Sequence, residues 1–380
     1  MSRRCLFLFL LSLSLALVLP TGQVQAGFPE PDKDQLSTDE DSFVCISRLV
    51  RPNWYVCLPY GPGDTAARLA NIRLPDPLPE LTVTPLPPQE GSSAPFTYAQ
   101  VVQDRAPVYT HPIEAVYGLP PKRRLGVGFI WVSVQGQTTY EGRDYYQINA
   151  GEYVPAAALS LYRPSAFQGI ALAEQPERPF AWVLSAVRPL LTPGGEVNAD
   201  APAYQRYQVV QIFATERHDD QLWYLIGPDQ WINQVDVGKV TPSAPPPGVG
   251  AGAAWIDVDL FEQTLAAYVG DRMVYATLVS SGLPGWNTPP GLFQVWRKVE
   301  SGKMSGAHNR PDYYFLEDVP WALYFNQSVA LHGAYWHNSF GYQHSHGCVN
   351  LAVADARWLF YWAPEPLWVR VQPGQGPASN

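Results

Sequence analysis

A histidine and a cysteine near the carboxyl-terminal end of the chain have the types and surroundings that covalent catalysis requires. His332 ends an apolar run, and Cys348 lies within the sequence SHGCVN at residues 345–350. The thiolate form of cysteine is the nucleophile, and its pKa falls when an imidazolium lies beside it. A histidine at the end of one strand and a cysteine on a neighbouring turn can meet without being adjacent in sequence. The pair therefore predicts a thiol enzyme in which His332 activates Cys348.

Gly347, directly before the cysteine, suits chemistry on a carbonyl group. Without a side chain next to the nucleophile, a substrate carbonyl can approach closely, and backbone N–H groups can hold the oxyanion that develops on it. Enzymes that transfer or hydrolyse acyl groups need both features. The sequence contains neither Gly-x-Ser-x-Gly nor a phosphate-binding Gly-x-x-x-x-Gly-Lys-Ser/Thr, so other common nucleophile and nucleotide signatures are absent.

The sequence SHGCVN, with His332-Gly333 fourteen residues before its histidine, closely resembles the signature of the YkuD-type L,D-transpeptidases, which cross-link peptidoglycan. Two other segments resemble that family. Residues 255–265 are similar to its opening hairpin, and residues 287–293 are similar to its Thr-Pro-x-Gly-x-Phe turn. The resemblance covers residues 254–372, about a third of the chain. We expect neither a cofactor nor a metal ion.

The resemblance implies a role for each residue of the motif. Cys348 corresponds to the nucleophile that attacks a carbonyl of a donor stem peptide, on the residue before a terminal D-amino acid, and His332 to the proton donor and acceptor. The thioester is then released by an amine of a neighbouring stem peptide, which forms a cross-link, or by water, which would make the enzyme an L,D-carboxypeptidase. The positions that correspond to oxyanion or substrate binding are Ser345, His346, Gly347, Gly333 and Asn350.

Aromatic residues surround the catalytic histidine in the sequence. Tyr324 precedes His332 by eight residues on what we predict to be one strand. Since side chains on a strand alternate with a period of two, both would share a face, and Tyr324 would line the cleft. Four aromatic residues between His332 and Ser345 could stack on sugar, shield the thioester from water or belong to the core. They are Tyr335, Trp336, Phe340 and Tyr342.

A zinc site and an inactive wall-binding scaffold are the alternative interpretations. Imidazole and thiolate are preferred zinc ligands, and His344, His346 and Cys348 would share one face of a strand. No carboxylate or second cysteine joins this group, and His-Glu-x-x-His does not occur. Tandem β-modules could bind wall peptides beside an inactive domain, but the intact pair of His332 and Cys348 argues against inactivity.

Two stretches before the catalytic segment resemble each other. Residues 145–154 and 223–232 share a pattern of aromatic and β-branched residues at an offset of 78. Short runs of this kind, bounded by turn residues, are typical of small all-β units, and both resemble bacterial SH3-like domains. One larger β-domain is the alternative. We therefore expect a mostly β, multidomain protein, with tandem SH3-like small barrels at 96–165 and 178–241 followed by a β-rich catalytic domain at 254–372.

The remaining boundaries are marked by acidic and proline-rich segments. Residues 27–95 are acidic and then rich in proline, and residues 242–253 form a Pro/Gly linker. Cys45 and Cys57 lie close together in the first of these segments, and outside the cytosol we expect them to form a disulfide. Cys348 is then the unpaired thiol.

Residues 1–26 have the features of a secretory signal peptide. Arg3 and Arg4 precede an apolar stretch at 5–19, and residues 24–26 form a small-residue cleavage site. A stretch of about 15 apolar residues is short against the ~20 that span a bilayer, although an uncleaved anchor is the alternative. We expect export to the periplasm, cell wall or extracellular space, with no transmembrane span in the mature chain.

The composition agrees with an exported, β-rich wall enzyme. Of 380 residues, 46% are hydrophobic and only 16% are charged, and 38 are proline. Prolines at about twice the usual ~5% disfavour long helices. A net charge of −9 argues against nucleic acid as a partner. The expected partners are donor and acceptor stem peptides of peptidoglycan, and we expect a monomer.

Overall fold

The computed structural model describes residues 42–47, 55–60, 72, 74–86 and 94–374, and at 42–47 and 55–60 the backbone alone. The predicted signal peptide and residues 27–41 lie outside these ranges. Strands β1 (Ser42–Ser47) and β2 (Tyr55–Tyr60) pair antiparallel, with Cys45 directly opposite Cys57. Because the side chains of both strands lie outside the description, the disulfide stays a prediction. Within the described ranges, no helix has the length and apolarity needed to cross a membrane.

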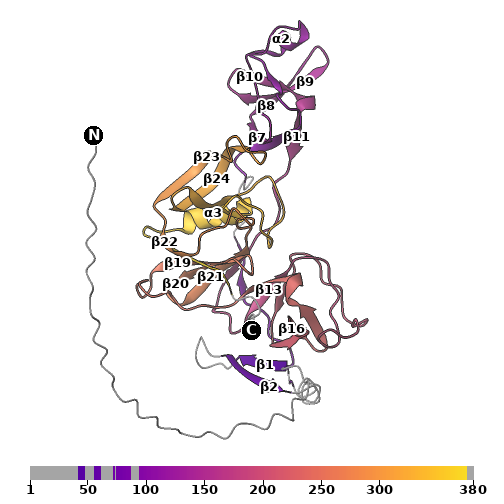
Figure 1. Cartoon of the computed structure of the whole chain (residues 1–380), viewed down its shortest axis with the longest axis vertical. Coiled ribbons are helices and arrows are strands. Elements are labelled where there is room, and N and C mark those ends of the chain that lie inside the picture. Colours follow the sequence, from indigo (N-terminus) through magenta and orange to yellow (C-terminus); the bar gives the residue numbers. More distant parts are fainter. Residues whose placement is uncertain (1–41, 48–54, 61–71, 73, 87–93, 375–380) are drawn as a thin grey trace, which may run out of the picture. The chain divides into compact units, whose positions relative to one another are not determined.

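The described part of the chain is mostly β-structure, as predicted, and its two largest sheets have seven strands each (Figure 1). The first sheet has the order β22 (Gly291–Gln294), β27 (Trp368–Gln372), β19 (Ala254–Asp259), β20 (Thr264–Val269), β21 (Arg272–Leu278), β12 (Ile170–Leu172) and β3 (Val83–Thr84). The second has the order β11 (Leu159–Tyr162), β4 (Thr97–Val101), β7 (Phe129–Val134), β24 (Tyr314–Asn326), β25 (Val329–Gly333) and β26 (Val349–Leu351), and β23 (Arg297–Gly306) pairs with β24.

The remaining described elements are short and form smaller sheets. One sheet has the order β17 (Gln230–Asn233), β16 (Gln221–Gly227), β15 (Ala214–His218), β1 and β2. The others are β10 (Glu152–Pro155), β9 (Arg143–Asn149) and β8 (Gly136–Tyr140); β14 (Val209–Gln211), β13 (Phe180–Val183) and β18 (Val237–Val240); and β5 (Pro107–Val108) with β6 (Arg123–Arg124). Helix α2 (Pro112–Val116) follows β5.

The start of the predicted catalytic segment is a three-stranded meander, as its turn residues indicate. Strands β19, β20 and β21 pair antiparallel in sequence, with turns after Asp259 and at Gly270-Asp271. Gly270 has a φ of +62°, a conformation that glycine adopts without steric cost. Nearly all side chains of β20 are buried, so this strand lies at the centre of a covered sheet.

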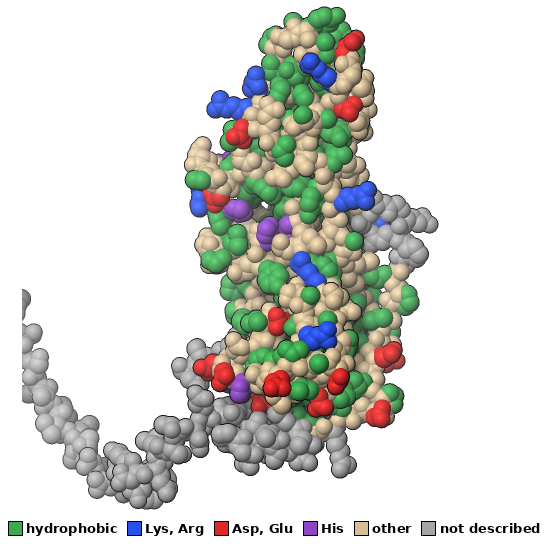
Figure 2. All heavy atoms as spheres, turned by 90° about the vertical axis from the view of Figure 1, so that its right-hand side faces the viewer, with side chains coloured by type: hydrophobic (Ala, Val, Ile, Leu, Met, Phe, Trp, Pro, Cys, Tyr) green, Lys and Arg blue, Asp and Glu red, His purple; other side chains and the backbone are tan. Residues whose placement is uncertain are grey.

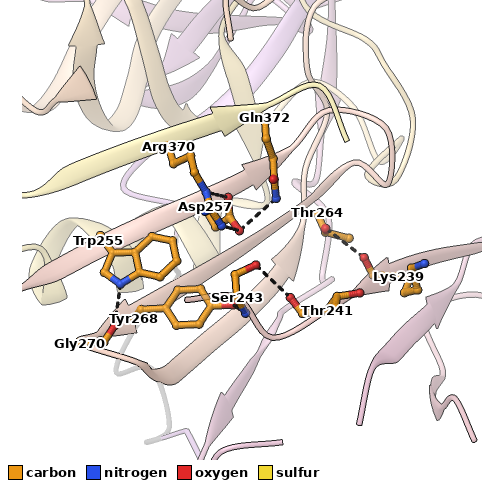
Figure 3. Close-up of polar contacts among 10 residues, drawn as sticks. All are labelled: Lys239, Thr241, Ser243, Trp255, Asp257, Thr264, Tyr268, Gly270, Arg370 and Gln372. Carbon is orange, nitrogen blue, oxygen red and sulfur yellow. Dashed lines mark hydrogen bonds and ion pairs between the residues drawn. The ribbon is translucent and has the colours of Figure 1, made fainter. Parts of the chain in front are cut away.

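Polar contacts fix the register of this sheet and attach the preceding linker to it (Figure 3). Arg370 of β27 donates to Asp257 of β19 at 2.8 Å, across a parallel pair in which the two residues are partners. The indole of Trp255 is stacked on Tyr268, with ring centroids 4.1 Å apart, and donates to the carbonyl of Gly270. The Tyr268 hydroxyl in turn accepts from the backbone N–H of Ser243, which belongs to the Pro/Gly linker.

Helix α3 (Val353–Trp362) is the element that the sequence did not reveal. Its first cap position is Ala352, which makes no side-chain capping hydrogen bond, and the segment is rich in aromatic residues that also favour strands. The helix contacts both large sheets (Figure 1): it packs against β24 and β25, and Trp358 stacks on Tyr275 of β21 with centroids 4.0 Å apart. The apolar side chains between the sheets form one continuous core.

The internal repeat extends over four consecutive elements. Strands β9 and β10, the 3₁₀ turn η1 (Ala156–Ala158) and β11 are followed 78 residues later by β16, β17, η2 (Gln234–Asp236) and β18. Each element of the second copy therefore begins 78 residues after its counterpart, as the sequence pattern suggested. The assignment of the two copies to SH3-like domains stays a prediction. We call residues 96–165 the first repeat and residues 178–241 the second repeat.

The first repeat shares a sheet with the catalytic segment. Strand β7 of the repeat runs parallel to β24, with Phe129 to Trp131 opposite Tyr314 to Leu316. The Tyr98 ring of β4 stacks on Tyr335 with centroids 3.5 Å apart. The sheet that carries His332 is thus continued by strands from a separate part of the sequence.

We predict that Asp355→Ala lowers the free energy of unfolding by about 3 kcal/mol, because it leaves several buried donors without an acceptor. The fully buried carboxylate of Asp355 accepts from the Tyr275 hydroxyl at 2.7 Å, from the Gly169 N–H at 2.8 Å and from the Thr277 hydroxyl. Denaturant unfolding measures the change. Glu300→Ala, at an exposed position of β23, is the matched control; equal losses in the two variants would contradict the prediction.

Candidate functional site

Parallel pairing of β25 with β26 places the segments that carry His332 and Cys348 side by side. His332 lies opposite Asn350, and Leu331 opposite Val349. Cys348 lies at a bend directly before β26, two residues before Asn350. A short parallel pair joined by a long connection therefore places Cys348 beside Ala330, two residues before His332 in β25.

Tyr324 and His332 lie on two strands, so the prediction of one continuous strand was wrong. A tight turn at Gln327-Ser328 ends β24 and begins β25, and Tyr324 pairs with Ala330. Gln327 has a φ of +49°, which marks the reversal of the chain. Tyr324 still borders the thiol, because the electrostatic influence of Cys348 contributes, after burial, to raising the pKa of Tyr324.

The sulfur of Cys348 lies beside the start of β25. Its Sγ is 3.8 Å from the carbonyl oxygen of Ser328, and the backbone N–H of Ala330 donates to it. The residue is only partly buried. Even so, burial of the sulfur raises the pKa of the thiol above its ordinary value, and the bond from Ala330 opposes this only in part. The resting thiol is therefore protonated at neutral pH.

His332 is also neutral at rest. Its side chain is 2% exposed, and burial lowers the pKa of the imidazole to about 4. Nδ1 lies 3.3 Å from the carbonyl oxygen of Gly333, an acceptor, so the neutral ring carries its proton on Nδ1 and leaves Nε2 as the basic nitrogen. The sequence suggested a thiolate beside an imidazolium. Burial of both groups instead favours the uncharged pair, because neither charge is well solvated there.

Gly333 and Gly347 each meet a local requirement of the backbone. A Cβ at Gly333 would lie within 3.1–3.3 Å of Pro320 and Val353, so this glycine permits close packing of β25. Gly347 has a φ of +118°, and its N–H donates to Ser345 Oγ at 3.0 Å. That N–H is thus bonded to a side chain in this structure, and the oxyanion role that the resemblance implies for Gly347 stays a prediction.

The turn before Cys348 is held by two hydroxyl groups. Ser345 Oγ accepts from Gly347 and donates to the Cys348 carbonyl oxygen at 2.5 Å. Thr288 Oγ1 donates to the Gly347 carbonyl oxygen at 2.9 Å and accepts from the Gly282 N–H at 3.0 Å. Ser345 therefore shapes the loop rather than contacting the sulfur. Thr288, from the predicted Thr-Pro turn, holds the same loop through its hydroxyl group.

His346 packs in an aromatic cluster. Its ring lies 4.8 Å from Trp286 and 4.9 Å from Tyr314, measured between centroids. Asp312 holds the other edge: its Oδ2 is 3.6 Å from His346 Nε2 and accepts from the Trp286 indole at 3.1 Å. This arrangement attaches the loop around Asp312 to the motif that carries the cysteine.

Asn350 contacts a third histidine that the sequence did not single out. The Asn350 amide lies 2.9 Å from His337 Nε2, and His337 Nδ1 accepts from the Ser339 N–H at 3.0 Å. His337 is 5% exposed, and burial lowers its pKa to about 3, with smaller contributions from His344 and His332. We call residues 334–344, between β25 and Ser345, the connecting segment.

The connecting segment has little regular secondary structure, and its aromatic residues divide between core and surface. Tyr335 and Phe340 are fully buried, so these two belong to the core. The Trp336 ring lies 5.7 Å from the His332 ring, and Tyr342 is 44% exposed. On the face shown in Figure 2, several histidine side chains lie near the middle of the molecule and another lies apart near the lower end.

The residues of the zinc alternative do not lie on one strand. Residues 346–348 form bends rather than the extended segment that would align His344, His346 and Cys348. Among the residues described, no group of three or more His, Cys, Asp or Glu side chains could hold a metal ion.

Three residues of this site escaped the sequence interpretation: Thr288, Asp312 and His337. Thr288 had a signal, since it belongs to a turn similar to one of the family, although no role was assigned to it. Asp312 and His337 act through contacts between distant segments, and nothing in their local sequence indicates these partners.

We predict that alkylation of Cys348 by iodoacetamide accelerates with pH to a midpoint above the ~8.5 of a free thiol, because burial favours the protonated form. Rate measurements between pH 6 and 10 test this, with Cys348→Ser giving the background from other cysteines. A midpoint below pH 7 would instead indicate a resting thiolate and imidazolium.

The region that matches known proteins coincides with the predicted catalytic segment. Residues 253–371 match the family model YkuD, described as the L,D-transpeptidase catalytic domain, which confirms the resemblance predicted for 254–372. The Bacillus subtilis protein YciB, whose name describes it as a candidate L,D-transpeptidase, is 26% identical over 138 residues, or 31% of this chain and 66% of that protein.

Solved structures also match part of the chain. A cysteine-to-serine mutant of Enterococcus faecium L,D-transpeptidase is 26% identical, with 32% of this chain and 50% of that chain covered and a TM-score of 0.30. An L,D-transpeptidase from Mycobacterium smegmatis is 22% identical, with 42% and 73% covered and a TM-score of 0.31. The chain thus spans about half the length of the enterococcal structure and 66% of YciB.

Proposed function

We propose that the protein is a peptidoglycan L,D-transpeptidase, on the premise that residues 253–371 match the YkuD L,D-transpeptidase catalytic domain. The reaction is acyl transfer through a cysteine thioester. The donor is a stem tetrapeptide, and the acceptor is an amine of a neighbouring stem peptide. The same premise supports an exported protein that acts on the cell wall.

In the first step, His332 Nε2 takes the proton of the Cys348 thiol as the sulfur attacks the donor carbonyl. The backbone N–H of Cys348 donates to the oxyanion, since the Gly347 N–H is bonded to Ser345. The tetrahedral intermediate then breaks its C–N bond. The terminal D-amino acid leaves as an amine, which receives the proton from the imidazolium, and the acyl group remains on sulfur.

In the second step, the acceptor amine attacks the thioester carbonyl while His332 removes a proton from its nitrogen. The C–S bond breaks, and the sulfur takes that proton back to become the thiol. The products are a cross-linked peptide and the resting enzyme. Water in place of the amine would complete a carboxypeptidase reaction by the same path, so the outcome depends on the nucleophile that reaches the thioester.

The parallel pairing of β25 with β26 is the observation that carries this proposal. It supports catalysis because it sets the strand that ends in His332-Gly333 beside the segment of Cys348, a partly buried residue, while His332 is buried. Both groups are neutral at rest, which suits a general base that takes the proton only as the nucleophile attacks.

We predict that Cys348→Ala abolishes both cross-linking of purified peptidoglycan and covalent labelling by a carbapenem, because no other residue supplies the acyl-accepting sulfur at this site. Chromatography of digested peptidoglycan and intact-protein mass spectrometry measure the two results. His218→Ala, which changes an exposed histidine of the second repeat, is the control that retains both. Failure of the wild-type protein to form any adduct would favour the scaffold alternative.

We predict that the rate of acylation by a carbapenem stays constant from pH 8 down to about pH 5 and falls only as His332 is protonated near pH 4. The reason is that burial lowers the pKa of His332, so the base remains unprotonated well below the usual ~6.5. Stopped-flow labelling across this range tests it, with circular dichroism at each pH to verify folding. An acid limb centred near pH 6.5 would contradict the assignment.

A further inference from the structure

The connecting segment depends on side-chain contacts for its position, because it has little regular secondary structure. Its ends are fixed by His332 and Ser345, and it contains His337, which contacts Asn350. Asn350 is the strand partner of His332. A displacement of this segment would therefore reach the catalytic pair through His337 and Asn350.

Asn338, the residue after His337, is held by side chains from outside the catalytic domain. Its backbone carbonyl oxygen accepts from Arg206 Nη2 at 2.8 Å. Its side-chain oxygen accepts from the Tyr207 hydroxyl at 2.8 Å and from Ser165 Oγ at 2.5 Å. Arg206 and Tyr207 belong to the second repeat, and Ser165 ends the first.

Apolar contacts extend this attachment along the connecting segment. Phe340 is fully buried, and its ring is stacked with Phe167 at 6.1 Å, while Phe167 lies 4.3 Å from Tyr207, measured between centroids. Gly341 approaches so closely that a Cβ there would lie 2.3 Å from Leu184 of the second repeat. The backbone of the segment is thus in van der Waals contact with the repeat.

The contacts between His337 and Asn350 transmit this attachment to the catalytic strands. Because His337 Nδ1 accepts from the Ser339 N–H, the neutral ring carries its proton on Nε2. That proton is donated to the Asn350 amide when the amide oxygen faces the ring, an orientation assigned here from the hydrogen bonds. Tyr207 is then linked to His332 by a hydrogen bond to Asn338, the peptide bond from Asn338 to His337, a hydrogen bond from His337 to Asn350 and the pairing of Asn350 with His332.

We propose that Arg206 and Tyr207 of the second repeat are positioning residues for catalysis. By holding Asn338, they fix His337 and Asn350 and thereby the geometry of His332 relative to Cys348. The second repeat then contributes to catalysis by positioning His332, rather than serving only as a spacer. This inference rests on the proposed acyl transfer at Cys348.

The test compares two phenylalanine variants that each remove one hydroxyl from the second repeat of the full chain. Tyr207→Phe removes the bond to Asn338, whereas Tyr204→Phe removes a bond to Gln230 within the repeat. Misplacing catalytic groups by about 1 Å can cost roughly a hundredfold. We expect Tyr207→Phe to lower the carbapenem acylation rate constant by roughly tenfold with little change in the half-saturating concentration, and Tyr204→Phe to leave both unchanged.

A rescue series separates positioning from a loss of folding. Asn338→Ala removes the side-chain acceptor and should reduce acylation, whereas Asn338→Asp retains an acceptor oxygen and should keep most of it. Thermal unfolding of every variant verifies folding. Equal acylation by the Tyr207→Phe and Tyr204→Phe proteins, or equal loss in both Asn338 variants, would overturn the proposal. A different result would count against the proposed function instead: a wild-type protein that is acylated by the carbapenem but forms no cross-links.

Discussion

The site depends on one short parallel pairing, between β25 and β26. Three residue pairs join a strand that ends in His332-Gly333 to one that begins just after Cys348. The connection between them is long, so loop-closure entropy opposes the pairing, and burial and packing must offset that cost. Ser345 and Thr288 hold the turn before the cysteine, and Gly333 allows β25 to pack closely on Pro320 and Val353. These contacts hold the segments of Cys348 and His332 side by side.

Burial sets the chemistry of the pair as much as proximity does. A buried imidazole with a pKa near 4 and a thiol with a raised pKa form an uncharged resting state. Such a thiol is less reactive toward small electrophiles than a preformed thiolate. Proton transfer would then accompany attack on a bound carbonyl, where the developing charge is met by backbone donors rather than by water. The cost of separating charge in the buried site is restricted to the moment of reaction.

The sequence predicted those features that local patterns encode. Residues 255–265 resemble an opening hairpin, which β19 and β20 form, and the repeat at an offset of 78 corresponds to four successive elements. The motif around Cys348 identified the catalytic residues to be tested. The sequence did not indicate the contact of His337 with Asn350, because the two residues belong to distant segments. It also missed two local features: the tight turn that separates Tyr324 from His332, and helix α3, which lacks a capping side chain. The sequence also suggested a thiolate beside an imidazolium. The burial that keeps both groups uncharged depends on tertiary packing, which the local sequence does not encode.

The central claim is that a donor acyl group is carried by the sulfur of Cys348. The most direct measurement is intact-protein mass spectrometry after brief incubation with a defined disaccharide-tetrapeptide in the absence of an acceptor, followed by peptide mapping. The account predicts a mass gain equal to the donor less its terminal D-amino acid, located on the peptide that contains Cys348. Turnover of that donor with no adduct on Cys348, or with the adduct on another residue, would contradict it.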